Sequence, residues 1–229
     1  MRVAIMQPTY LPWLGYFHMM SQVDTFLLLD TVQFEKKSWQ QRNRIRGADG
    51  EILLTVPVRT AGRFDQLIMD VEIDESVNFP RKHLKTIELN YQRSVHSKEF
   101  LNDLIPLIKD TSVTLGEYNA RLISHLASAL GVTANILLAS QLSSTGRSTE
   151  LTVRQCVELG ASHFLAAGGS YEYVSREPGF AENGIRVEFH DYTPEPYEQM
   201  YPGFIPYLSA LDALLCLGPA ATSLLGNRS

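Results

Sequence analysis

The sequence predicts an α/β fold: an open, mostly parallel sheet flanked by helices, with a small β-hairpin and a helical insertion. Short apolar runs that end in polar or proline-containing loops alternate with longer segments whose apolar residues recur at helical spacing. The opening segments have the order of a parallel βαβ unit: a buried strand at Val3–Met6, a helix at Trp13–Gln22 and a strand at Thr25–Leu29. A hydrophobic content of 45% over 229 residues suffices for a single domain, 1–229, with a substantial core.

Two features interrupt this alternation. Ile52–Val58 and Ile68–Ile73 are predicted as strands that pair with each other outside the parallel sheet. The polar, basic stretch Glu35–Arg46 precedes them. Three helices are expected to form the insertion at about residues 78–131: Phe79–Asn90, Lys98–Lys109 and Leu115–Leu130.

The second half of the chain returns to alternating strands and helices. Strands are predicted at Asn135–Ala139, His163–Ala166 and Ile185–Phe189. Helices are predicted at Thr149–Leu159, with Ser148 as the N-cap, and at Ile205–Leu217, ended by Gly218 and Pro219. A short helix or loop is expected around Tyr173–Asn183, and the tail Thr222–Ser229 is expected to be loose.

Composition excludes several classes of function. The 25 acidic residues outnumber the 20 lysines and arginines, so non-specific binding to DNA is not expected. No window is apolar over the length of a membrane span, and the N-terminus does not resemble a signal peptide, so the expected location is the cytoplasm. The six histidines and two cysteines lack the spacing of a metal site, so no metal site is predicted.

The loop at residues 7–17 is the first candidate for binding a ligand. It follows a strand and begins a helix, and ligands of parallel α/β sheets bind at the carboxyl ends of strands. Gln7 begins the loop, and Tyr10, Trp13 and Tyr16 offer flat faces with polar edges. The structural alternative is a proline-stiffened loop that packs on its own aromatic residues.

A second group of candidates follows the second strand. Asp30 ends that strand, and Gln33 and Lys36 lie in the next loop. Arg42 and Asn43 can supply forked donors to a phosphate or a carboxylate. The alternative for this basic stretch is a solvated surface hairpin.

Two later strands end in further candidates. The turn Gly168-Gly169-Ser170 can hold an anion with its backbone N–H groups, or it can be an ordinary tight turn. Tyr173 can line the same crevice. His190 ends the strand Ile185–Phe189 and is a candidate acid or base.

Together these residues resemble a known family. The segment QPTYLPWLGYF at residues 7–17, followed by Asp30, Gln33, Trp39 and RNRI at 42–45, is similar to the opening of the WbqC-like proteins. Further similarities extend over nearly the whole chain: TVPV at 55–58, Lys82-His83 with Asn90-Tyr91, Gly146–Thr149, Phe180 with Gly184-Ile185, and residues 197–199 and 203–212.

The resemblance implies a reaction. WbqC-like proteins are associated with the assembly of O-antigen and related sugars, and a glycine- or aminoacyl-transferase role has been proposed for them. It therefore implies an acyl or aminoacyl transferase that forms an amide on an amine, such as a nucleotide-linked amino sugar. An acyl or aminoacyl carrier is an implied partner. His83 is the preferred general base, with Asp30 as the other residue that could take the amine proton.

Two other interpretations stay open. The order of strand, P-x-x-L-G-Y-F loop and helix is also similar to the HUP-type nucleotidyl transferases and pantothenate synthetase, and Leu142–Arg147 (LSSTGR) resembles their second phosphate motif. ATP with Mg²⁺ is the cofactor of that alternative, an ATP-dependent amide ligase, although the histidine pair of the first motif is missing. The other alternative is a non-catalytic module that binds a nucleotide sugar or a carrier.

Overall fold

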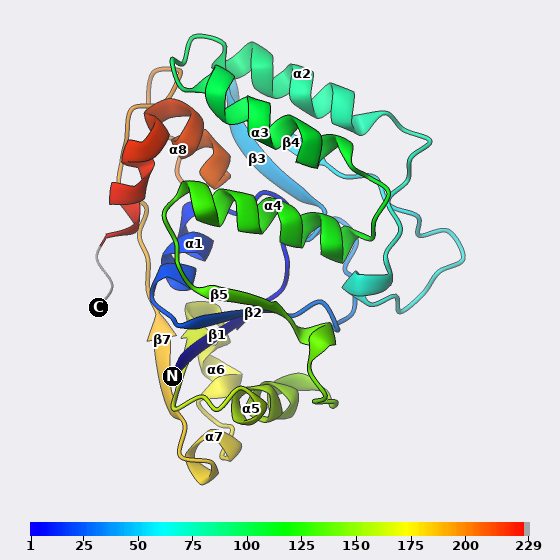
Figure 1. Ribbon diagram of the computed structural model, residues 1–229, viewed down its shortest axis with the longest axis vertical. Helices are drawn as coiled ribbons and strands as arrows, with labels where there is room; N and C mark the ends of the chain where they lie inside the picture. Colours follow the sequence, from blue (N-terminus) through cyan, green and yellow to red (C-terminus); the bar gives the residue numbers. More distant parts are fainter. Residues whose placement is uncertain (227–229) are drawn as a thin grey trace.

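The computed structural model describes residues 1–226 and contains a five-stranded, all-parallel open sheet (Figure 1). The strand order is β5-β2-β1-β6-β7, which confirms the predicted α/β class. The five strands are β1 (Arg2–Met6), β2 (Thr25–Leu28), β5 (Asn135–Leu138), β6 (His163–Ala167) and β7 (Arg186–His190).

The sheet has a topological switch point beside its central strand, β1. From β1 the chain moves to β2 and β5 on one side, and it later returns to β6 and β7 on the other. The loops that follow β1 and β6 therefore diverge at the carboxyl edge of the sheet. A crevice at such a point is where open α/β sheets bind ligands.

Helices cover both faces of the sheet because the side chains of each strand alternate in direction. Ala4, Phe26 and Leu28 belong to the larger core, beneath helices α1, α4 and α8. Val3 and Ile5 belong to a second core, beneath α5, α6 and α7. The bounds of these helices are α1 Leu14–Ser21, α4 Leu115–Ala129, α8 Ala210–Leu217, α5 Ser148–Glu158, α6 Tyr171–Val174 and α7 Gly179–Glu182.

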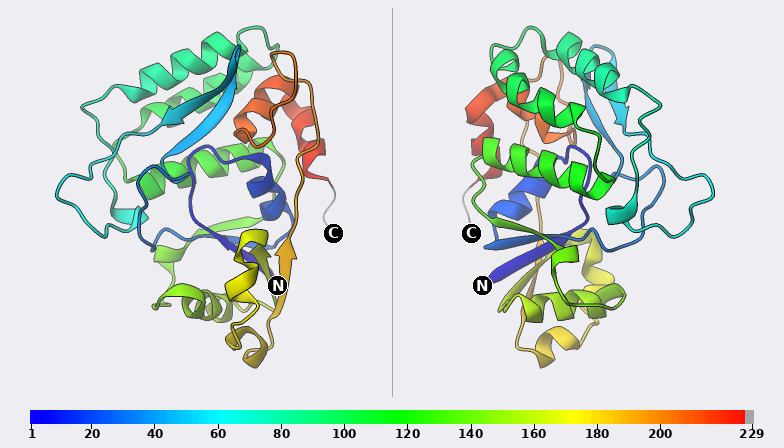
Figure 2. Two further views of the ribbon diagram at one scale, coloured as in Figure 1. Left: turned by 180° about the vertical axis from the view of Figure 1, so that it is seen from behind. Right: turned by 45° about the vertical axis from the view of Figure 1, so that its right-hand side comes forward.

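An outer layer covers the larger core. It consists of helices α2 (Phe79–Tyr91) and α3 (Ser97–Lys109) together with the antiparallel hairpin of β3 (Arg42–Gly47) and β4 (Gly50–Thr55) (Figure 2). Helices α2, α3 and α4 lie close to their predicted positions. Within residues 1–226, no helix is both long enough and apolar enough to cross a lipid bilayer.

The prediction that Ile52–Val58 pairs with Ile68–Ile73 was wrong. The basic stretch supplies β3, which pairs with β4 across a two-residue turn, and Ile68–Asp70 forms a short 3₁₀ helix, η1. An isolated bridge between Val58 and Ile73 is what remains of the predicted pairing. A two-residue turn closes a shorter loop than residues 59–67 would, and Gly50, directly after the turn, has a positive φ of 136°.

Three other predicted boundaries were also wrong. Ser148 is the first residue of α5, with φ of 54°, and its N-cap position is held by Arg147 without a side-chain hydrogen bond. Helix α8 begins at Ala210 because Ser209 caps it by accepting a hydrogen bond from the Leu211 N–H. The predicted loose tail is helical at first, since η4 spans Gly218–Leu225, and residues 227–229 lie outside the described chain. Two further 3₁₀ turns are η2 (Ala139–Gln141) and η3 (Gly168–Ser170).

A buried carboxylate joins the outer layer to the C-terminal helix. Asp212 on α8 is fully buried and accepts hydrogen bonds from the hydroxyl groups of Tyr91 and Tyr197, each at 2.5 Å, and from Gln199 Nε2 at 3.0 Å. Burial raises the pKa of the Asp212 carboxyl, and the three donors oppose that rise. The carboxylate is the common acceptor for three donors on two segments.

We expect Asp212→Ala to lower the free energy of unfolding by about 2–4 kcal/mol, because it leaves three buried donors without an acceptor. Urea denaturation measures the change. Asp103→Ala is the matched control: Asp103 is exposed on α3 and should change the stability by less than about 0.5 kcal/mol. An equal loss in both variants would contradict a structural role of this carboxylate.

Candidate functional site

The loop after β1 is largely buried, and two asparagine side chains satisfy its backbone. Asn43 Nδ2 donates to the carbonyl oxygens of Tyr10 and Leu11, at 3.0 and 2.9 Å. Asn119 Nδ2 on α4 donates to the carbonyl oxygen of Pro8 at 3.1 Å. Both amide hydrogens of Asn43 are engaged within the protein, so Asn43 positions the loop, and the predicted role as an anion donor does not fit this geometry.

Tyr10 and His83 form part of the core. Tyr10 is 0% exposed, its ring stacks on Tyr118, and its hydroxyl group lies 2.8 Å from His83 Nδ1. His83 is 6% exposed, and burial lowers its pKa to about 4, opposed by a hydrogen bond to the Thr55 backbone. Burial argues against the predicted roles of Tyr10 as a ligand platform and of His83 as the general base, because both side chains are shielded from solvent in this conformation.

Three other predicted residues support the site from within. Asp30 is 3% exposed, and its two carboxylate oxygens accept hydrogen bonds from the backbone N–H and the hydroxyl group of Ser140, at 2.9 and 2.6 Å. This pair joins the loops after β2 and β5, and it leaves Asp30 unable to reach an amine. Gln7 accepts from Gln40 Nε2 at 2.8 Å, and the Ser170 hydroxyl group donates to its own turn.

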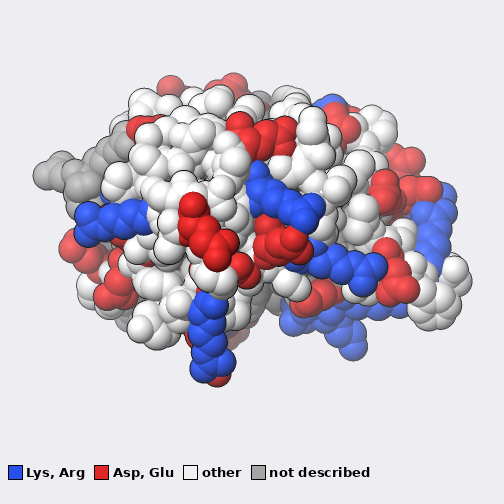
Figure 3. Space-filling view, turned by 90° about the horizontal axis from the view of Figure 1, so that it is seen from below, with Lys and Arg blue, Asp and Glu red and all other residues white. Residues whose placement is uncertain are grey.

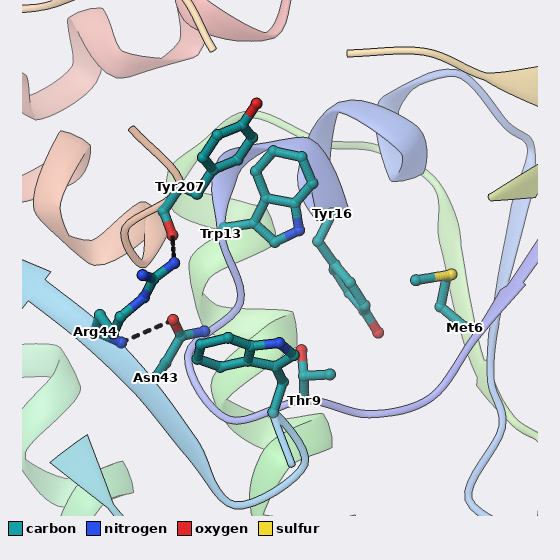
Figure 4. Close-up of a pocket in the computed structure, with 8 residues that line it drawn as sticks. Met6, Thr9, Trp13, Tyr16, Asn43, Arg44 and Tyr207 are labelled. Atoms are coloured by element: carbon teal, nitrogen blue, oxygen red, sulfur yellow. Dashed lines mark hydrogen bonds between the residues drawn. The ribbon is translucent and has the colours of Figure 1, made fainter. Parts of the chain in front are cut away.

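An aromatic pocket of about 280 Å³ opens beside this loop (Figure 4). Trp39 and Tyr207 are about half exposed there, and the Trp13 ring lies 5.3 Å from that of Tyr207. Gly15 makes room for Trp13, because a side chain at Gly15 would collide with the indole. The residues that line the aromatic pocket are Met6, Thr9, Trp13, Tyr16, Trp39, Asn43, Arg44 and Tyr207.

Two guanidinium groups flank the Trp39 ring. The Cζ atoms of Arg42 and Arg44 lie 5.8 and 5.1 Å from its centroid, within the range of cation–π attraction. Arg44 also binds Glu51 through two hydrogen bonds. Arg42 does not line the aromatic pocket, but its guanidinium lies against Trp39, which does, and has no ion pair or hydrogen bond within residues 1–226.

A histidine pocket of about 270 Å³ lies on the other side of Trp13 and Tyr16, which line both cavities. His190 lines it, together with Gly168 and Gly169. The pocket therefore lies at the switch point between β1 and β6. Of the predicted residues, it contains Trp13, Tyr16, Gly168, Gly169 and His190.

His190 has a partner that sequence reasoning missed. His190 Nε2 lies 2.7 Å from Nδ1 of His18 on α1, and Tyr192 packs against both rings. Burial lowers the pKa of His190 to about 4, and His18 lowers it further while Asp191 opposes the shift. His190 is thus uncharged at neutral pH. The two histidines are 172 positions apart, and His18 looks in sequence like any polar residue at the edge of an apolar helix.

A third cavity, the carboxyl-edge groove, has a volume of about 1040 Å³. Two predicted residues, Gln33 and Tyr173, line it, and Gln33 Nε2 donates to Asp65 at 2.8 Å. Lys36 is exposed and lines none of these three cavities. The full lining is Leu29, Thr31, Val32, Gln33, Asp65, Leu67, Gly146–Thr149, Leu151, Thr152 and Tyr173.

The LSSTGR segment fits the phosphate motif that it resembles only in part. The backbone N–H groups of Ser143 and Ser144 are already engaged, because they donate to the Glu158 carboxylate at 2.7 and 2.8 Å. The segment also follows β5, at the edge of the sheet, with β2 between it and β1. Within residues 1–226, no three His, Cys, Asp or Glu side chains are grouped to hold a metal ion.

Comparison with known proteins gives two findings. The family described as "WbqC-like protein family" matches residues 7–224. The chain is also 33% identical over 222 residues to "Uncharacterized protein Rv1507c" of Mycobacterium tuberculosis, covering 96% of this chain and 95% of that one. No solved structure matches significantly.

The buried His83 makes stability depend on pH. The unfolded chain takes up this proton near the reference pKa of 6.5, whereas the folded chain does so only near 4, so stability falls as the pH drops through that window. We expect the His83→Gln variant, which keeps an acceptor for Tyr10, to depend less on pH. Between pH 7 and pH 5 its free energy of unfolding should fall by about 1–2 kcal/mol less than that of the parent. Urea midpoints at both pH values measure this.

Leu84→Ala is the control for this experiment. It should lower stability at both pH values by removing a buried side chain on the same helix, without changing the difference between them. If His83→Gln keeps the full pH dependence of the parent, the assignment of a neutral, buried His83 is wrong.

Proposed function

The chain belongs to the WbqC-like protein family, and from that premise we propose that it is an acyl or aminoacyl transferase that forms an amide on a small-molecule amine. The acceptor class is a nucleotide-linked amino sugar. The observation that carries this proposal is the adjacency of an aromatic pocket and a histidine pocket at the switch point of the sheet. One cavity suits a flat group and the other suits proton transfer.

The aromatic pocket holds the nucleoside end of the acceptor. Trp13 and Trp39 supply faces on which a base can stack, an interaction worth about 1–3 kcal/mol per base. Arg42, which has a guanidinium without an acidic partner, binds the diphosphate beside Trp39. A ligand held in this way extends past Tyr16 into the histidine pocket, because Tyr16 lines both cavities.

The histidine pocket holds the reacting amine. The amine nitrogen attacks the acyl carbon and forms the C–N bond, and the bond from that carbon to the leaving group breaks, with its electron pair departing on the leaving group. If His190 Nε2 donates to His18 Nδ1, then His190 Nδ1 keeps a free lone pair and accepts the amine proton. Tyr192, packed on both rings, holds the pair in orientation.

We expect Trp39→Ala to raise the KM for the nucleotide-linked amino sugar about tenfold, because it removes one stacking face. Trp39 is 47% exposed, so the fold should persist. Thermal stabilisation by UDP- or dTDP-linked amino sugars should fall in parallel. Phe64→Ala, which removes an aromatic side chain that is 85% exposed and outside the aromatic pocket, should leave both measurements unchanged. Unchanged ligand binding in Trp39→Ala would argue against this pocket.

His190→Ala should lower kcat by a factor of about 10²–10⁴ with acceptor binding largely kept, because it removes the proton acceptor. Mass spectrometry of the acylated product measures turnover with several acyl donors. His163→Ala, at the opposite end of the adjoining strand β6, is the control and should keep full turnover. If no donor yields product although the nucleotide sugar binds tightly, the protein is a binding module and the transferase proposal fails.

A further inference from the structure

The carboxyl-edge groove is the largest of the three cavities and has no place in the acceptor site. Its volume of about 1040 Å³ compares with about 280 and 270 Å³ for the aromatic and histidine pockets. It opens at the same edge of the sheet, since Leu29 directly follows β2 and Leu28 of β2 pairs with Met6 of β1. An acyl transfer needs two substrates, and this groove is available for the second.

The groove contains a guanidinium without a partner. Within residues 1–226, every arginine except Arg42, Arg81 and Arg147 forms an ion pair or a side-chain hydrogen bond. Arg147 lines the groove. Arg147 is exposed at the wall of the groove, and its guanidinium therefore remains available to an anionic ligand.

Three other polar groups of the groove are also free, whereas Gln33 and Asp65 of the same lining are hydrogen-bonded to each other. The hydroxyl groups of Thr149, Thr152 and Tyr173 have no hydrogen-bond partner in the described part of the chain. They lie beside apolar side chains of the same lining, among them Leu67 and Leu151. A ligand that fits this lining has an anionic, hydrogen-bonding end and a less polar arm.

The segment that carries Arg147 is held in place before any ligand arrives. Glu158 binds the backbone of Ser143 and Ser144, and Arg154 donates to the Thr145 carbonyl oxygen at 2.9 Å. Ser148 has a positive φ of 54°, a conformation that is unfavourable for a non-glycine residue and persists only where surrounding contacts impose it. A groove wall fixed in this way binds with a smaller loss of conformational entropy.

We propose that the carboxyl-edge groove binds the acyl donor, through a phosphate on Arg147, and this rests on the transferase function proposed above. The donor is an acyl group whose leaving group bears the phosphate, either a phosphopantetheine thioester or an acyl-adenylate. In the transfer, the C–S or C–O bond of the donor breaks, the leaving group keeps the electron pair and stays in the groove, and the acyl carbon bonds to the amine. The amine proton goes to His190.

A macromolecular donor is a poorer fit to this side of the molecule. On the face seen from below, lysine or arginine side chains lie interspersed with those of aspartate and glutamate (Figure 3). A polyanion such as tRNA requires a continuous basic surface. The single free guanidinium of the groove suits a small phosphate ligand.

Isothermal titration of the full chain with coenzyme A and, separately, with ATP tests the proposal. We expect one of them to bind, and Arg147→Ala to weaken that binding about tenfold or more, because a charge-assisted contact is lost. Arg147→Lys should restore part of it. Coenzyme A binding indicates a thioester donor, and ATP binding indicates an adenylate. Arg186→Ala, at the opposite edge of the sheet, is the matched control and should bind like the parent.

Two outcomes overturn the groove assignment: neither probe binds, or Arg147→Ala binds as tightly as the parent. If amide product forms while Arg147→Ala leaves the donor KM unchanged, the transferase function stands and the groove assignment fails. If binding depends on Arg147 but no donor yields product, the groove is a phosphate-ligand site and the transferase function fails. Trp39→Ala should leave probe binding intact, which separates the two sites.

Discussion

The structure depends on satisfying the backbone of one buried loop. Residues 8–12 run through the interior between the sheet and the outer layer, where an unpaired carbonyl group is costly. Asn43 and Asn119 supply the missing donors to three of these carbonyl groups, and the Ala210 N–H supplies another to Pro12 at 2.7 Å. The same loop therefore forms hydrogen bonds with the hairpin, with the helical insertion and with the C-terminal helix. These shared contacts account for the packing of the three elements over one face of the sheet.

Fixing this loop also fixes the site. Trp13 and Tyr16 follow the anchored segment directly, so the wall shared by the aromatic and histidine pockets has little freedom to move. Two residues near this wall, Leu11 and Tyr207, have positive φ angles of 43° and 61°. Strain of this kind persists only where surrounding contacts impose it, and it is concentrated at functional sites. Buried polar residues and exposed aromatic residues here serve one purpose, which is to hold a preformed crevice open.

Local patterns predicted the parts of the fold that are locally determined. The β1-α1-β2 unit follows from periodicity and strand order, and so does the expectation that its carboxyl edge carries the candidate site. The first strand of the hairpin could not be predicted from the sequence. The arginines of β3 suggest a solvated loop, and Ile45 is its one apolar residue that is buried. Tyr10 and Tyr16 stand in the same loop and look alike in sequence, yet the former lies in the core and the latter lines two cavities. Packing against α4 and α2, which lie far along the chain, determines that Tyr10 is the buried one.

The positions of two unpaired arginines are relevant to the proposed transferase function. Arg42 lies beside Trp39 of the aromatic pocket, Arg147 lies in the carboxyl-edge groove, and both cavities open at the carboxyl edge of the same sheet. A hydrolase needs one such anion site and access for water. Two proposed anion sites beside a pocket with a partnered histidine of lowered pKa are consistent with the proposed reaction, in which two phosphate-bearing substrates meet and a proton is removed. The anchored loop is what keeps these sites in a constant relation to each other.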